Sequence, residues 1–169
     1  MGFLEIKKEL NKLEKSQLID LISDLYKKEI SLKEYFGFYL KPDEKKLLDE
    51  YKSKVKEGFF PKRGFPKLSI SRKAINDFKK FEVSQECVAD IMLYYVECGI
   101  EFINGYGDDD EHLITSLENA YEKTLKLIDK ENLLEKFKER AKSIYEKSDG
   151  FGYGFEDIVG DCYSYYYES

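Results

Sequence analysis

The sequence predicts an all-α protein, and three observations lead to this expectation. Apolar residues recur every three or four positions through most of the 169 residues, no segment alternates with the period of two typical of a strand, and capping residues or glycines separate the helical stretches. We expect about nine helices in antiparallel pairs, as an irregular bundle or a short superhelix of helical repeats. They would form a single domain, residues 1–169, with a candidate subdivision near residues 58–69.

Four helices are expected in the first 58 residues. Apolar spacing predicts the first over residues 3–13. Ser16 is a candidate N-cap for the second, and Ser31 begins a capping-box pattern for the third. Pro42 then ends the third helix and starts the fourth, because proline is tolerated at the first helical position, and Gly58 ends the fourth.

The longest apolar stretch, residues 84–104, is the expected centre of the fold. A helix that is apolar nearly all round must be covered on most of its sides, and its three acidic residues argue against a membrane span. Ser84 has the chemistry of an N-cap, and Gly105 and Gly107 mark the end. The other helices therefore pack around this one.

The remaining helices are predicted from shorter apolar stripes. One precedes the central helix, at residues 71–81, and one follows it, at residues 113–128. A break near Asn132 leads to a helix over residues 133–145. A glycine-rich bridge then precedes a tyrosine-rich terminal helix, residues 155–167.

Charge is strongly segregated along the chain, although the net charge is only −6. Residues 52–80 carry ten basic and two acidic side chains, whereas residues 81–122 carry eleven acidic and no basic ones. Either the basic segment packs beside acidic ones within the fold, or the protein has a two-faced surface that orients partners. The acidic total argues against a dedicated nucleic-acid binder.

The cysteines and the N-terminus favour a cytoplasmic protein. The three cysteines, at positions 87, 98 and 162, have neither a CxxC pair nor a metal-ligand spacing, so we expect core thiols in a reducing compartment. Charged residues come early at the N-terminus and no apolar signal region follows. We expect no membrane association.

Three short stretches together resemble a family of small bacterial proteins of unknown function. They are Phe38-Tyr-Leu-Lys-Pro-Asp43, Phe59-Phe-Pro-Lys-Arg-Gly64 and Tyr106-Gly-Asp108, in this order. The run from Gly150 to Phe155 is also similar, although the family more often has a tryptophan there and this chain has none. The resemblance implies an all-helical fold and carries no catalytic residue or ligand.

Two surfaces are candidate binding sites for another protein. The first is a loop in which basic and aromatic residues alternate: Phe59, Phe60, Lys62, Arg63, Phe65 and Lys67. Such a loop could recognise an acidic peptide or, with rings stacking on bases, a nucleic acid; alternatively, its rings simply fix the loop to the core. The second surface is the terminal helix, through Tyr163 and Tyr166, because tyrosine is favoured at interfaces.

Two acidic groups suggest alternative chemistry. Asp108, Asp110 and His112 concentrate oxygen ligands and the single histidine, so they could bind a metal ion or serve a hydrolase. Acidic residues are also favoured at a helix N-terminus without any ligand. In the central helix, Asp90, Glu97 and Glu101 lie near one face. Glu97 and Glu101 could act as acid and base; alternatively, the three residues mark the one exposed edge of the helix or pair with the basic helix at 71–80.

These observations favour a non-catalytic, cytoplasmic protein-interaction module without a cofactor, whose partner is another protein. Two alternatives stay open: a metal-binding protein or hydrolase using residues 108–112, and nucleic-acid binding through residues 52–80.

Overall fold

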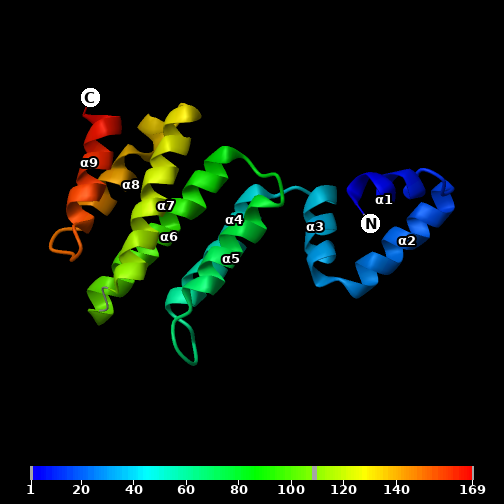
Figure 1. Cartoon of the computed structure of the whole chain (residues 1–169), viewed down its shortest axis with the longest axis horizontal. Coiled ribbons are helices and arrows are strands. Elements are labelled where there is room, and N and C mark those ends of the chain that lie inside the picture. The colour runs from blue at the N-terminus through cyan, green and yellow to red at the C-terminus, as the bar shows by residue number, and fades with distance from the viewer. Residues whose placement is uncertain (1, 108–109, 169) are drawn as a thin grey trace. The chain divides into compact units, whose positions relative to one another are not determined.

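The computed structural model describes residues 2–107 and 110–168, and this part of the chain forms nine helices and no strand (Figure 1). The all-α prediction is confirmed. The helices are α1 (Phe3–Leu10), α2 (Lys15–Lys28), α3 (Ile30–Leu40), α4 (Glu44–Phe59), α5 (Leu68–Lys79), α6 (Gln85–Tyr106), α7 (Glu111–Lys130), α8 (Leu134–Glu146) and α9 (Phe155–Tyr167). None of these helices is long and apolar enough to cross a membrane. Internal contacts divide the chain into two compact units, and the boundary between them in the sequence lies between Pro42 and Asp43.

The first unit contains α1, α2 and α3. The predicted caps at Ser16 and Ser31 are wrong, because both serines lie inside helices. Helix α2 instead begins after Glu14, whose backbone N–H donates to the Gln17 side chain at 2.9 Å in a capping box. Helix α3 begins after Glu29, which has an extended backbone. None of the residues described in these three helices is buried.

The second unit is an array of three antiparallel helical pairs. Helix α4 pairs with α5, α6 with α7, and α8 with α9, and the pairs follow one another in chain order (Figure 1). Successive pairs also pack on each other, through α4 against α6 and α7 against α9. This arrangement is the bundle or short repeat array that the sequence predicts.

Helix α6 lies at the centre of the second unit, as expected. Twelve of its residues are buried. The Ser84 side chain accepts a hydrogen bond from the Cys87 backbone N–H at 3.4 Å, and Gly107 ends the helix with a φ of +66°. Gly99 allows close packing, because a Cβ there would lie 2.4 Å from the Leu117 side chain of α7.

The segment at 58–69 contains the end of α4, the start of α5 and, at residues 60–67, the loop that joins them. The Lys67 backbone N–H donates to the Gly58 carbonyl at 2.8 Å, which closes the loop at its base. The buried Ser71 hydroxyl donates to the Val55 carbonyl at 2.7 Å and ties α5 to α4. The extent of the single domain stays a prediction.

Candidate functional site

The acidic side chains of α6 are paired with basic residues of α4 and α8. Arg140 of α8 donates two hydrogen bonds to the Glu97 carboxylate, from Nε at 2.8 Å and from Nη2 at 2.9 Å. Its Nη1 donates to Asp90 Oδ1 at 2.8 Å. Lys52 of α4 also contacts Asp90 Oδ1, at 2.5 Å. The expected pairing with the helix at 71–80 is wrong, since the partners come from α4 and α8.

The ion pairs of Asp90 keep this carboxylate charged. Burial acts to raise the pKa of Asp90, but hydrogen bonds and charge from Lys52 and Arg140 outweigh it, and the pKa lies below its usual value. Glu97 is held in a two-point pair, and Glu101 lies 3.9 Å from Lys56 Nζ. Each carboxylate thus has a structural partner.

The basic-aromatic loop is only partly available to a partner. Phe59 is 1% exposed, and its ring packs on Tyr95 and Phe102 in the core. Phe60 is half-buried against Phe102. The remaining predicted loop residues are exposed, and Phe65 is 87% exposed. They are Lys62, Arg63, Phe65 and Lys67. Binding by this loop stays a prediction.

The tyrosines of α9 divide in the same way. Tyr163 is buried, and its ring stacks between Tyr145 and Tyr167 with centroids 5.7 and 5.0 Å away. Tyr166 is half-buried and meets Tyr165 edge to face. Tyr163 therefore contributes to packing, and an interface role for Tyr166 stays a prediction.

The acidic cluster at 108–112 is described only in part, because Asp108 and Asp109 lie outside the described residues. Asp110 caps α7, since its side chain accepts a hydrogen bond from the His112 backbone N–H at 3.4 Å. Within residues 2–107 and 110–168, no three His, Cys, Asp or Glu side chains could together hold a metal ion. A metal site that includes Asp108 stays a prediction.

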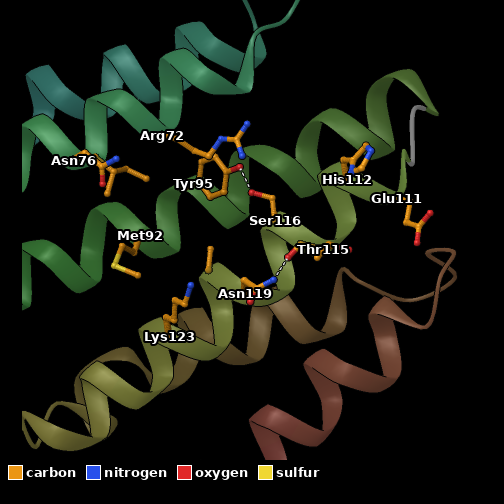
Figure 2. A pocket seen from close by; sticks show the side chains of 12 residues that line it. Arg72, Asn76, Met92, Tyr95, Glu111, His112, Thr115, Ser116, Asn119 and Lys123 are labelled. Atoms are coloured by element: carbon orange, nitrogen blue, oxygen red, sulfur yellow. Dashed lines mark hydrogen bonds between the residues drawn. The ribbon is translucent and has the colours of Figure 1, made fainter.

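A groove of about 650 Å³ opens between α5 and α7, with α6 as its floor. Figure 2 shows the side chains that line it, among them Arg72 and Asn76 from α5, Met92 and Tyr95 from α6, and Glu111, His112, Ser116, Asn119 and Lys123 from α7. Both walls follow the helical period, with positions 72 and 76 on one side and 112, 116, 119 and 123 on the other. One face of each helix therefore points into the groove.

The floor of the groove is fixed by a buried aromatic ring. Tyr95 is 2% exposed, and its hydroxyl shares a hydrogen bond with Ser116 Oγ at 2.8 Å. Burial raises the pKa of Tyr95, although Ser116 and the positive charge of Arg72 oppose this rise. The side chain that forms the floor is thus neutral at physiological pH and held in place.

The side-chain amides on the groove walls have N–H and carbonyl groups without hydrogen-bond partners among the described residues. Asn119 Nδ2 donates one hydrogen bond to the Thr115 carbonyl at 2.7 Å, so its second N–H and its Oδ1 have no partner among the described residues. The side-chain amide of Asn76, on the opposite wall of the groove, has no hydrogen-bond partner among the described residues. The two amides can therefore bind a ligand from opposite sides.

Two basic side chains and one acidic side chain line the groove, namely Arg72, Lys123 and Glu111, and no ion pair joins them among the described residues. Among the described residues, no carboxylate pairs with Arg72, Lys79 or Lys123. Partial burial and the neighbouring charge of Lys123 lower the pKa of Lys79, so these two amines lie close together across α5 and α7. This contrasts with Arg140 and Lys52, which are fully engaged by α6. Arg72 and Lys123 outnumber Glu111 in the lining, and Lys79 lies near Lys123, so the groove carries an excess of positive charge.

A comparison of the sequence with models of protein families identifies the family of the chain. The model of the Family of unknown function (DUF6155) matches residues 1–153. The chain belongs to this family. The DUF6155 match spans both units and all the groove residues, and it ends just before α9. The expected resemblance to a family of unknown function is confirmed. No curated protein and no solved structure matches the chain in the same comparisons.

Proposed function

We propose that the protein is a non-catalytic interaction module that binds an acidic, extended segment of another protein in the α5–α7 groove. The observation that carries this proposal is that Arg72 and Lys123 line one groove from opposite walls without described carboxylate partners, while Lys79, outside the lining, adds its charge beside Lys123. Like charges held close together are costly, and a negatively charged ligand would relieve that cost.

The amides make a peptide a suitable ligand. A side-chain amide offers two N–H donors and one oxygen acceptor, which match the acceptor and donor of a peptide group. Asn76 and Asn119 present these groups from opposite walls. A chain lying between them could therefore be held by its backbone, while acidic side chains reach the basic groups.

The length of the groove fits a short extended segment. From His112 to Lys123 the α7 wall rises by roughly 17 Å, at about 1.5 Å per residue. An extended chain advances about 3.3 Å per residue, so this wall spans approximately five peptide residues. Peptide binding between packed helical pairs is also a common use of helical-repeat surfaces.

The surroundings favour a short acidic peptide over a nucleic acid. Residues 81–122, which form the floor and most of one wall, carry eleven acidic and no basic side chains. The net negative charge of this segment opposes the binding of a long polyanion. In addition, the phenol ring that lines the groove, that of Tyr95, is buried and hydrogen-bonded rather than free to stack on a base.

The experiment is to select binders of the full chain from random hexapeptides displayed on phage. The selected peptides are then synthesised with a fluorescent label, and their affinity is measured by fluorescence polarisation. We expect the selected peptides to be rich in Asp and Glu. Lys123→Glu should weaken their binding by roughly tenfold or more, because an attraction becomes a repulsion. Lys126→Glu is the matched control, since it makes the same charge change on an exposed position of the same helix.

Two results would contradict the proposal. One is a set of selected peptides without acidic residues, and the other is an equal loss of binding in the Lys123→Glu and Lys126→Glu proteins. A labelled single-stranded RNA serves as a parallel probe. RNA binding that weakens steeply with salt and is abolished by Lys123→Glu, without acidic peptide binding, would assign the groove to nucleic acid instead.

A further inference from the structure

The first three helices expose an unusual amount of apolar surface. Of the nineteen large hydrophobic residues exposed in the described part of the chain, thirteen lie between Phe3 and Leu40. Their exposed fractions add up to about seven complete residues, or on the order of 1,000 Å² at roughly 150 Å² each. This total is spread over three helices, whereas the largest single apolar patch on a typical monomer is about 300–600 Å².

Helix α3 has the composition of a buried helix. Seven of its eleven residues are large and apolar or aromatic: Ile30, Leu32, Tyr35, Phe36, Phe38, Tyr39 and Leu40. A helix that is apolar on all sides is normally covered on most of them. Here α2 covers one side, where the Tyr26 and Phe36 rings meet edge to face at 6.2 Å, and no residue of α3 is buried.

An apolar groove of about 420 Å³ runs between α2 and α3. Ile22 and Tyr26 form one wall, Phe36 and Leu40 the other, and Gly37 lies between them on α3. A Cβ at Gly37 would meet no atom within 4 Å. Glycine in a helix interior costs about 1 kcal/mol relative to alanine, and nothing in the described chain uses the space that it leaves. The close approach of another helix would use it.

We propose that two copies of the chain associate through this groove, with the α2–α3 face of one copy packed on the α2–α3 face of the other. The surface is self-complementary, because side chains such as Ile22 and Leu40 on the rims can enter the groove of the second copy, as a two-fold interface requires. The exposed apolar residues of α2 and α3 alone amount to roughly 700 Å², close to the approximately 800 Å² of total area per partner in a stable interface.

The charge of this unit supports a second copy as the occupant. Residues 1–42 carry eight lysines and seven acidic residues, so two copies meet with little net repulsion. A membrane surface or a nucleic acid would favour a clear basic excess, which this unit lacks. This proposal is independent of the peptide groove, which lies on α5–α7.

The test is the molar mass of the full chain in solution, by light scattering and sedimentation equilibrium over a concentration series. We expect a dimer. Ile22→Lys should weaken dimerisation by roughly tenfold or more, because it places a charge in an apolar interface. Asp20→Asn, which makes the same charge change on an exposed residue of the same helix, should leave the dimer unchanged.

Gly37→Leu separates loss of the interface from loss of the fold. The added side chain meets nothing within its own chain at the Cβ position and raises helix propensity, so helix content by circular dichroism should be kept or increased. The dimer should nevertheless weaken, because the side chain fills the space that a second copy needs. A monomeric wild-type chain, or a dimer that neither Ile22→Lys nor Gly37→Leu weakens, would overturn the proposal.

Discussion

Replacement of Arg140 by methionine tests whether the α6 ion pairs stabilise the second unit. The methionine keeps most of the side-chain length but removes the guanidinium, which donates four hydrogen bonds to Glu97 and Asp90. The Arg140 side chain is 30% exposed, between a buried and a surface ion pair. Breaking a buried pair costs about 3–5 kcal/mol and an exposed one less than about 1 kcal/mol. We expect a loss of about 2–3 kcal/mol in the free energy of unfolding.

The pH dependence of this loss follows from Asp90. Its pKa in the folded protein lies below the unfolded value of about 3.9, because Lys52 and Arg140 hold the carboxylate charged despite its burial. A lowered folded pKa contributes stability above the unfolded pKa, and that stability is lost as the pH falls through the folded pKa. The cost of Arg140→Met should therefore be largest at neutral pH and shrink below about pH 4.

Urea unfolding followed by circular dichroism, at neutral pH and in acid, measures both effects. Lys138→Met is the control, because Lys138 lies on the same helix and has no ion-pair partner among the described residues. A loss at neutral pH below about 0.5 kcal/mol, within the range of ordinary surface substitutions, would refute the reasoning. So would a loss that is the same in acid as at neutral pH.

Three further predictions concern the packing of the second unit. Gly58→Ala would place a Cβ 2.0 Å from Ser71 Oγ and 2.8 Å from its backbone N, so we expect a loss of roughly 2–3 kcal/mol and a lower Tm; an unchanged Tm would contradict this. Tyr121→Phe removes the buried hydroxyl that donates to the Ala141 carbonyl at 3.0 Å, which should cost about 1 kcal/mol in urea unfolding, and a more stable variant would count against that bond. Burial raises the pKa of Cys98 to about 11, so this thiol should react with a disulfide reagent only in denaturant; rapid labelling of Cys98 in the native protein, located by mass spectrometry, would disprove its burial.

The sequence was most informative where one segment determines its own structure. The centre of the fold could be found because residues 84–104 are apolar nearly all round, and its ends because Ser84 and Gly107 have the required capping chemistry. Caps failed in the first unit, where Glu14 and Glu29 precede the helices and the nearby serines lie within them. A serine close to a helix start is only one of several residues that can cap it.

Features made by helices distant in sequence could not be predicted. The acidic residues of α6 were expected to pair with the helix just before it, but Arg140 lies 43 residues beyond Glu97 and reaches it only because α8 packs on α6. The α5–α7 groove was missed for a similar reason. Arg72, Asn76 and Asn119 look like ordinary solvated positions on two separate helices, and only the packing of both helices on α6 brings them together.

The position of Asp90 has a consequence for how the second unit opens. A single oxygen, Oδ1, contacts Lys52 Nζ of the first helical pair and Arg140 Nη1 of the last, at 2.5 and 2.8 Å. Arrays in which each repeat contacts only its neighbours tend to fray from either end independently. Here, when α4 or α8 detaches from α6, Asp90 keeps only one of its two cations. The attraction between Asp90 and the remaining cation then becomes stronger, because the two cations no longer share one oxygen. The free energies of fraying at the two ends should therefore not be additive.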